Sequence, residues 1–225
     1  MIFSIAVDGP AGAGKSTIAK IISENFNLMY INTGAMYRAV TLFAIRGSIS
    51  PRDTTSLCNL MNSLEMRFDK NKLIVNGEDV SELIVLPDTS KKVSEYAAVK
   101  EVREHMVKIQ QDMSSKYNVI MDGRDIGTVV LKDAFIKFYI NASAEERAKR
   151  RYTELKEKGI VVDYDEILQD IIKRDFYDSH RDIDPLRKAE DAIEIDTSFL
   201  NIKEVVEKMS QYIYNKMREK NLMVE

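Results

Sequence analysis

Short runs of apolar residues alternate with longer stretches of helical spacing along most of the chain. Residues 2–7 form an apolar, β-rich run, and residues 16–25 follow a glycine-rich turn with the spacing of a helix. The same pairing recurs with a strand at 28–31 and a helix at 34–46. Further strands are predicted at 119–121, 135–140 and 192–195, the last followed by an amphipathic helix to about residue 216. Strands that alternate with helices indicate an α/β domain with a mostly parallel sheet.

One region departs from this alternation of strands and helices. Short strands are predicted at 66–68, 72–75 and 78–80, with polar turns at 69–71 and 76–77. Asn-Gly between two such strands is a hairpin signal. We therefore predict a single domain, 1–225, with its core at 1–60 and 90–225 and a small antiparallel insert at about 61–89. A long helix over 90–117 is expected to lead back to the core.

Composition excludes several classes of protein. The 33 Lys+Arg and 36 Asp+Glu give a net charge of −3, without the basic footprint of a nucleic-acid binder. No apolar run approaches the ~18 residues that span a membrane. The start carries no basic segment of a signal peptide, and the single cysteine, Cys58, suits a reducing compartment. We expect a soluble, cytoplasmic monomer that binds neither nucleic acid nor membrane, with Cys58 and the methionines in its core.

The sharpest motif is GPAGAGKS at residues 9–16, a full match to the P-loop pattern G-x-x-x-x-G-K-[ST]. Its glycines let successive backbone N–H groups face an anion, and the following helix adds its positive N-terminal dipole. Lys15 can then reach the β- and γ-phosphates, while the Ser16 hydroxyl can ligate Mg²⁺. The alternative, a glycine-rich turn that happens to hold Lys and Ser, does not explain why a strand precedes the motif and a helix follows it.

A P-loop predicts a nucleoside triphosphate but not a reaction. The guanine-reading N-K-x-D and the switch motif D-x-x-G of GTPases do not occur, and motor-type ATPases are usually larger. The size favours a small kinase whose acceptor binds beside the sheet, where strand ends of open α/β sheets hold ligands.

Candidate acceptor residues follow two of the strands. Thr33, Tyr37 and Arg38 lie at the start of the second helix, where a hydroxyl, an aromatic ring and a guanidinium fork suit a nucleotide. Asp122, Arg124 and Asp125 follow the strand at 119–121; the first can hold Mg²⁺ through water, the second a phosphate, and the third a sugar or base. A capped helix start with a surface arginine, and a polar turn with a local ion pair, are the plainer interpretations.

Two further clusters lie on helices. Arg147, Arg150 and Arg151 share a helical face and predict a lid that closes on the triphosphate, unless neighbouring glutamates neutralise them. Arg174, Asp178 and Arg181 also share a face, which fits either the acceptor site or an exposed ladder of ion pairs.

Together these segments resemble the bacterial cytidylate kinases. The resemblance rests on AVDGPAGAGKS (6–16), TGAMYR (33–38), DGRDIGTVV (122–130) and Arg174-Asp175 with Asp178 and Arg181, and includes VRE (102–104) and SAEERA (143–148). It covers nearly the whole chain in the right order. Two departures are mild: Ser16 stands where some members have Gly, and Thr33 where some have Ser.

The resemblance implies transfer of the ATP γ-phosphoryl group to CMP or dCMP with Mg²⁺, a nucleoside-monophosphate-kinase core, an insert beside the acceptor and a short lid at about 145–165. The ATP-binding residues it implies are Gly9, Pro10, Ala11, Gly12, Ala13, Gly14, Lys15, Ser16 and Thr17. The acceptor residues are Thr33, Tyr37, Arg38, Arg103, Arg124, Asp125, Arg174, Asp178 and Arg181. The catalytic cations are Lys15, Arg124, Arg147, Arg150 and Arg151, and the metal-binding residues are Ser16 and, through water, Asp122. Rival interpretations are a kinase for adenylate, a sugar or shikimate, and a regulator that holds ATP without transferring it.

Overall fold

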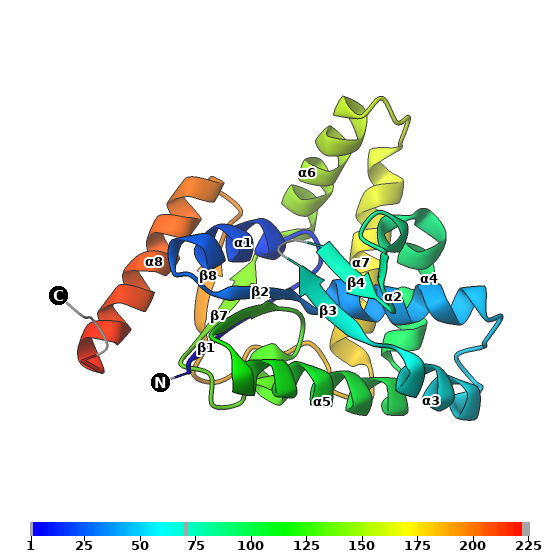
Figure 1. Cartoon of the computed structure of the whole chain (residues 1–225). Helices are drawn as coiled ribbons and strands as arrows, with labels where there is room; N and C mark the ends of the chain where they lie inside the picture. Colours follow the sequence, from blue (N-terminus) through cyan, green and yellow to red (C-terminus); the bar gives the residue numbers. More distant parts are fainter. Residues whose placement is uncertain (1, 70–71, 222–225) are drawn as a thin grey trace.

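The computed structural model describes residues 2–69 and 72–221, and its centre is a five-stranded parallel sheet (Figure 1). The strand order is β2-β6-β1-β7-β8. The bounds are Ser4–Asp8 for β1, Met29–Asn32 for β2, Val119–Asp122 for β6, Ile136–Asn141 for β7 and Ile193–Asp196 for β8. The predicted fold class is therefore confirmed. The connection from β1 runs to β2 on one side of the sheet and that from β7 runs to β8 on the other, so a topological switch point lies between the carboxyl ends of β1 and β7.

Helices cover both faces of the sheet, which explains why its strands are apolar throughout. Ile5 and Val7 of β1 pack with α1 (Lys15–Asn25) and α8 (Ile202–Glu219), whereas Ala6 faces the opposite layer. Alternate side chains of a strand point to opposite faces, so a single strand supplies both cores. The opposite layer consists of α2 (Thr33–Arg46), α3 (Thr54–Ser63) and α5 (Lys100–Lys116).

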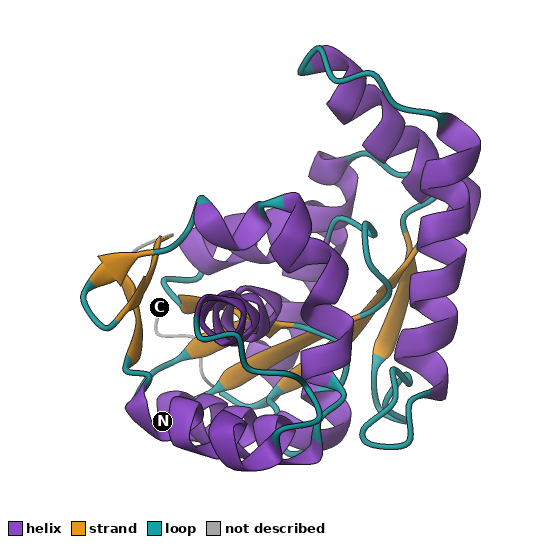
Figure 2. Ribbon diagram, turned by 90° about the vertical axis from the view of Figure 1, so that its right-hand side faces the viewer, coloured by secondary structure: helices purple, strands orange, loops and turns teal. Residues whose placement is uncertain are grey.

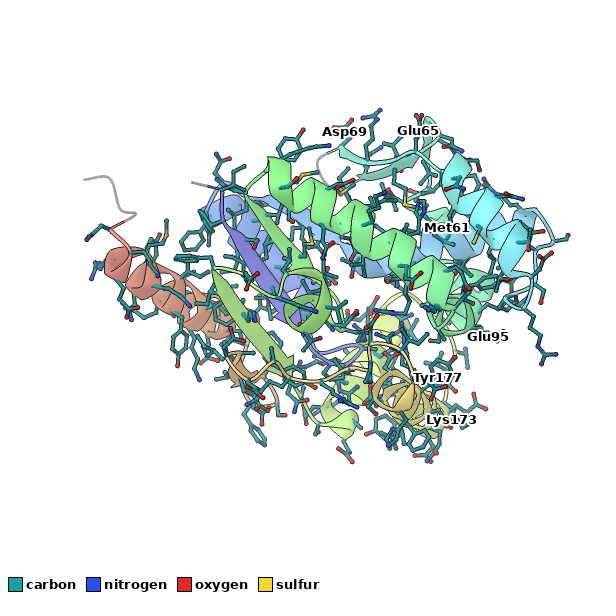
Figure 3. The ribbon with its side chains drawn as sticks, turned by 90° about the horizontal axis from the view of Figure 1, so that it is seen from below. Met61, Glu65, Asp69, Glu95, Lys173 and Tyr177 are labelled. Atoms are coloured by element: carbon teal, nitrogen blue, oxygen red, sulfur yellow. The ribbon has the colours of Figure 1, made fainter. Side chains whose placement is uncertain are left out.

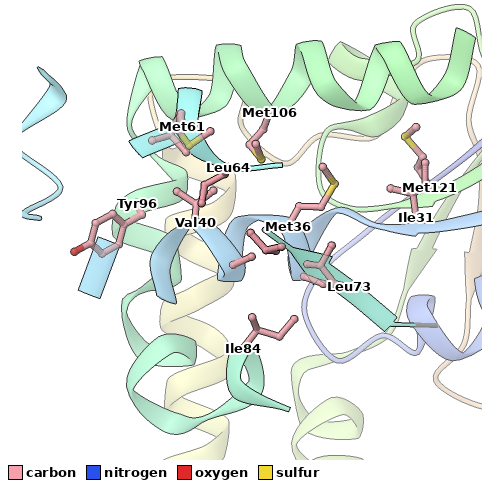
Figure 4. Packing of buried hydrophobic residues seen from close by; sticks show 14 of the residues in the cluster. Ile31, Met36, Val40, Met61, Leu64, Leu73, Ile84, Tyr96, Met106 and Met121 are labelled. Carbon is pink, nitrogen blue, oxygen red and sulfur yellow. The ribbon is translucent and has the colours of Figure 1, made fainter. Parts of the chain in front are cut away.

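Methionines fill much of the second core. Met36, Met61, Met106 and Met121 are at most 2 % exposed and converge between α2, α3, α5 and the sheet (Figure 4). Their unbranched side chains suit the irregular space between crossing helices. The expectation that methionines serve packing is confirmed for these four, whereas Cys58, expected in the core, is only half-buried.

The predicted insert is a separate antiparallel sheet of β3 (Met66–Asp69), β4 (Lys72–Val75) and β5 (Glu78–Asp79), set apart from the main sheet in Figure 2. Asn76 and Gly77 both have positive φ, 50° and 84°, as a tight Asn-Gly hairpin turn requires. Of the turn expected at 69–71, residues 70 and 71 lie outside the described part of the chain. A short 3₁₀ turn, Leu83–Val85, follows the insert.

The single helix expected over 90–117 is wrong. Two helices, α4 (Pro87–Ala97) and α5, are separated by Ala98 and an extended Val99 at φ −69° and ψ 126°. The break lets α5 bury Val102 and Met106 against the core while α4 lines a cavity described below. One straight helix could not do both, so tertiary packing overrides the continuous helical propensity.

The remaining helices, α6 (Ala144–Glu157) and α7 (Tyr164–His180), form a hairpin whose tip stands away from the core (Figures 1 and 2). Lys173 and Tyr177 on α7 point outward to solvent (Figure 3), which leaves the other side of this helix to the cavity. This hairpin contains the segment predicted as a lid. Among the described helices, none combines the length and apolarity that crossing a membrane requires.

Candidate active site

The phosphate loop leaves the central strand at Asp8 and enters α1 at Lys15. Gly9, Gly12 and Gly14 all have positive φ, between 78° and 143°, so the loop takes a path that other residues rarely adopt. At Gly9 the constraint is also steric, because a Cβ would overlap the carbonyl oxygen of Ile140. The loop therefore curls as the motif predicts, with backbone N–H groups and the positive end of α1 on its inner side.

Lys15 is buried at the floor of this loop and is 5 % exposed. Its Nζ donates to the Pro10 carbonyl oxygen at 2.6 Å. Burial lowers the pKa of Lys15 well below its usual value, and the nearby Arg124 guanidinium lowers it further. A bound anion would reverse both effects, because a negative charge stabilises the ammonium form.

A hydroxyl and a carboxylate meet beside the loop. The Ser16 hydroxyl donates to Asp122 Oδ2 at 2.5 Å, and the Tyr30 hydroxyl donates to Asp122 Oδ1 at 3.2 Å. Among the described residues no group of three or more His, Cys, Asp or Glu could form a metal cage. Mg²⁺ does not need one: it keeps several waters and binds through one or two protein oxygens plus phosphates. The donor set of Ser16 and Asp122 therefore fits this ion.

The start of α2 borders the same space. Asn32 caps the helix by accepting from the Ala35 N–H at 2.8 Å, and the Thr33 hydroxyl donates to the Asp122 carbonyl oxygen at 2.7 Å. Arg38 lies one turn further along α2, with its guanidinium in the same space. The capped helix start is real, but Arg38 is not the surface arginine of the plainer interpretation.

A cavity of about 190 Å³ collects the predicted acceptor residues beside the P-loop. Those that line it are Thr33, Tyr37, Arg38, Arg103, Arg124, Asp125, Arg174, Asp178 and Arg181, and Lys15, Ser16 and Asp122 line it as well. All nine acceptor candidates, drawn from four distant segments, thus share one cavity wall. The acceptor roles of the individual residues remain predictions.

The cavity is rich in positive charge that its own residues do not fully neutralise. Arg38 Nε and Arg174 Nε are buried and have no hydrogen-bond partner among the described residues. Burial, followed by the neighbouring Arg124, lowers the pKa of Arg174 to about 10, and burial also lowers that of Arg38. Unpaired buried donors and crowded cations are costly, and both costs are relieved by an anion. An anion such as a phosphate would satisfy the unpaired donors at this end of the cavity.

Asp178 joins α7 to the loop after β6. It accepts from Arg124 Nε at 2.8 Å, and its side chain is only 7 % exposed. Arg174, one turn earlier on α7, faces the cavity rather than solvent. The exposed ion-pair ladder considered for Arg174, Asp178 and Arg181 is therefore wrong. Asp178 and Arg181 pair with Arg124 and Asp125 from another segment, and Arg174 lines the cavity without an ion pair among the described residues.

At the far end of the cavity, two arginines hold one carboxylate. Arg103 Nη2 is ion-paired with Asp125 Oδ2, and Arg181 Nη2 lies 3.3 Å from Asp125 Oδ1. Arg103, at 1 % exposure, also sits over the Tyr37 ring at 5.6 Å. Burial raises the pKa of Asp125, and the two guanidinium groups oppose that rise. A carboxylate held in this way can still accept a hydrogen bond from a ligand amine.

The three lid arginines do not converge on one point. Arg147 is buried and contacts both the Ala11 carbonyl oxygen, at 3.0 Å, and Asp175, with Nη2 to Oδ2 at 2.5 Å. Arg150 donates instead to Thr197, after β8. Arg151 is exposed and paired with Glu154 at 2.9 Å. Glu154 therefore neutralises Arg151, as the alternative with neighbouring glutamates allowed, whereas Arg147 and Arg150 have partners outside α6; closure of this segment on a triphosphate stays a prediction.

A second pocket, of about 700 Å³, lies on the other side of the P-loop. Gly12, Thr17 and Arg150 line it together with Thr197 and Asn201, from the loop between β8 and α8. The last two were not among the sequence candidates, because nothing in their local pattern separates them from an ordinary helix cap. Asn201 indeed also forms a capping box with Glu204.

Other residues of the acceptor cavity were missed as well. Val93, Ser94 and Ala97 line it from α4, which the sequence predicts only as part of a longer helix. Asp8 accepts from the Ile126 and Gly127 N–H groups at 2.8 and 2.7 Å, and so joins the P-loop strand to the acceptor loop. The local signal for Asp8 is an acidic residue at the end of an apolar strand.

The fold and this site define a kinase of the P-loop class, with a phosphate loop and a second, cation-lined cavity next to it. A solved structure of an uncharacterised protein from Eubacterium ventriosum ATCC 27560 shares the fold over 96 % of this chain and 99 % of its own, with a TM-score of 0.52 and 15 % identity. The family model for cytidylate kinase matches residues 5–215. The chain belongs to the cytidylate kinase family.

Curated relatives agree with the family model over almost the whole length. A cytidylate kinase of Clostridium perfringens (strain SM101 / Type A) is 61 % identical over 212 residues, which cover 94 % of this chain and 98 % of that protein. A cytidylate kinase of Clostridium acetobutylicum is 61 % identical over 217 residues, covering 96 % of this chain and all of that protein. The resemblance stated from the motifs is therefore confirmed.

Proposed function

We propose that this protein transfers the γ-phosphoryl group of ATP to CMP and dCMP, giving CDP or dCDP and ADP. One observation carries the proposal: the acceptor cavity opens directly onto Lys15 and Ser16 of the phosphate loop. A monophosphate held by the arginines of the cavity would face a triphosphate held by the loop. Direct transfer then needs only alignment of the two phosphates and neutralisation of their charge.

The loop residues Gly9 to Thr17 are proposed to hold the triphosphate, and Lys15 to neutralise its β- and γ-oxygens. Ser16 and, through water, Asp122 would hold Mg²⁺, which when bound neutralises phosphate charge and orients the triphosphate. The pocket between Thr17, Arg150 and Thr197 is proposed to receive the nucleoside of ATP, because it adjoins the loop on the side away from the acceptor.

On the acceptor side, Arg38, Arg124 and Arg174 are proposed to bind the phosphate, since the two unpaired Nε groups lie there. Asp125, held by Arg103 and Arg181, suits the exocyclic amine of cytosine. Thr33 and Tyr37 are proposed to border the base, and Asp178 to contact the sugar. Asp178 also accepts from Arg124 Nε, so Asp178 would act on both the sugar and the phosphate of the acceptor.

The lid has a proposed role in excluding water, because an open site would hydrolyse ATP without an acceptor. Arg147 already donates to the P-loop carbonyl oxygen of Ala11, which places it beside the proposed triphosphate site. Arg150 and Arg151 would join the phosphate site only when α6 moves. Loop and cavity are both built from one chain, which supports a monomer, and the single cysteine supports the cytoplasm as its location.

The test is ADP release from ATP and Mg²⁺ with CMP, dCMP, UMP, AMP, GMP and shikimate offered separately. Strong stimulation by CMP and dCMP is the expected result. Stimulation by another acceptor alone would keep the P-loop kinase and overturn the assignment of the cavity. Hydrolysis that no acceptor stimulates would instead favour a nucleotide-binding regulator.

A further inference from the structure

Asp184 completes a closed ring of hydrogen bonds behind the acceptor cavity, together with Arg103, Arg181 and Asp125. Its Oδ2 accepts from Arg103 Nε at 2.9 Å, and its backbone carbonyl oxygen accepts from Arg181 Nε at 2.8 Å. Arg103 and Arg181 in turn both pair with Asp125. Asp184 does not line the cavity itself, so any influence on a ligand passes through the two arginines.

The backbone at Asp184 also has an uncommon, left-handed conformation. Its φ is +48°, one of five positive-φ residues other than glycine in the described part of the chain, and Pro185 follows it. Asp tolerates this left-handed conformation better than most residues. The turn aims the carbonyl oxygen at Arg181 and the carboxylate at Arg103, so one residue holds both guanidinium groups.

We propose that Asp184 is a specificity-determining positioning residue, which holds Arg103 and Arg181 so that the cavity presents the acceptor oxygens of Asp125 rather than arginine donors to the base. This inference rests on the proposed function, because it concerns how cytosine is told from uracil. Cytosine carries an amine, a donor, at the position where uracil carries a carbonyl oxygen, an acceptor.

The orientation of the Arg103 guanidinium matters because this group could itself bind the base. A free guanidinium offers five N–H donors and would bind the uracil carbonyl oxygen well. In the ring, Nη2 is committed to Asp125, Nε to Asp184 and Nη1 to the Ala97 carbonyl oxygen, at 3.3 Å. Without the Asp184 carboxylate, Nε loses its acceptor, and a guanidinium that gains freedom to turn can offer a donor to uracil.

The experiment compares CMP with UMP as acceptors for the wild type, Asp184→Gly and Asp184→Asn. Glycine removes the carboxylate and accepts the positive φ, so the turn is kept. We expect the ratio of kcat/KM for CMP to that for UMP to fall at least tenfold in Asp184→Gly, with KM for ATP changed less than twofold. Asp184→Asn keeps an oxygen that can face Arg103 and should recover part of the ratio.

Asp182→Gly is the matched control. Asp182 is exposed in the same loop and lies outside the ring, so this variant adds the same flexibility and should keep the wild-type ratio. Equilibrium titration of CMP and of UMP without ATP gives a second readout that is independent of turnover. If Asp184→Gly does not fold, Asp184→Asn carries the test, with a fall of at least threefold expected.

A ratio that stays within twofold of the wild type in the folded variants overturns the inference. So does an equal fall in Asp182→Gly, because loop flexibility would then explain the effect. Failure of the proposed function looks different: the wild type itself would not phosphorylate CMP.

Discussion

The Ser16 hydroxyl and the Asp122 carboxylate lie 2.5 Å apart, although 106 residues separate them in the chain. Parallel pairing of β1 with β6 brings them together, because both strands end at the same edge of the sheet. The pair joins the phosphate loop to the acceptor loop at the point where Mg²⁺ is proposed to bind.

This geometry predicts that Asp122→Asn weakens the response to Mg²⁺. The amide has nearly the size of the carboxylate but lacks its charge, so the Mg²⁺ concentration for half-maximal activity should rise about tenfold. Titration of activity with Mg²⁺ at saturating ATP measures this half-maximal concentration. Asp133→Asn, at an exposed position, is the control. An unchanged Mg²⁺ response would remove Asp122 from the metal site.

Lys15→Ala should abolish most activity and leave the fold intact. The variant loses a cation at the phosphates, which we expect to lower kcat at least 100-fold, or about 3 kcal/mol. Because burial already lowers the pKa of Lys15, its removal should not reduce the thermal midpoint. Lys20→Ala, on the same helix, should keep wild-type turnover. Near-normal turnover in Lys15→Ala would contradict the assignment of Lys15.

Asp178→Ala should weaken the acceptor more than ATP. The change frees Arg124 Nε and removes a carboxylate from the acceptor cavity. We expect KM for CMP and dCMP to rise at least tenfold, with KM for ATP within about twofold of the wild type. Asp170→Ala, at an exposed position of α7, should change neither. Equal losses for both nucleotides would argue against an acceptor-side role.

The raised pKa of the buried Asp8 carboxyl predicts that the stability of the fold depends on pH. Burial raises its pKa from 3.8 to about 7, although the Ile126 and Gly127 N–H groups oppose the rise. The folded state therefore holds this proton between about pH 4 and 7, where the unfolded state has released it. As pH rises through that window, the Asp8 contribution to the free energy of unfolding falls, by on the order of a few kcal/mol.

Asp8→Asn has no proton to release and should flatten this slope. Urea unfolding of both proteins at several values between pH 4.5 and 8 gives the difference. Parallel pH profiles for the two proteins would exclude Asp8 as the titrating group.

Local pattern was sufficient for the strands of both sheets and for the phosphate loop. Apolar runs with alternating helical stretches predicted all five strands of the parallel sheet within about two residues, and the Asn76-Gly77 turn predicted the hairpin. The P-loop was evident because its glycines, Lys15 and Ser16 are adjacent in the chain. Chemistry that depends on neighbouring residues can be read from their spacing.

Contacts between distant segments could not be read in this way. The helical propensity of residues 90–117 hides the break at Val99, which exists because α4 and α5 pack on different surfaces. Helical spacing alone put Arg147, Arg150 and Arg151 on one face, and predicted either a lid that closes on the triphosphate or neutralisation by neighbouring glutamates. Asp175, from the next helix, and Thr197, from the end of β8, instead partner two of these arginines.

The sequence by itself determined the parallel α/β core, the phosphate loop and most of the charged residues that line the acceptor cavity, because each depends on residue type and short spacing. Arg103 was implied only by the family resemblance, and Val93, Ser94 and Ala97 were found only in the fold. Only the tertiary structure decided which charges pair: Asp178 with Arg124, Asp125 with Arg103 and Arg181, and Asp184 behind them. The physical reason is that an ion pair depends on distance and burial, and for residues tens of positions apart the packing of the whole chain sets both.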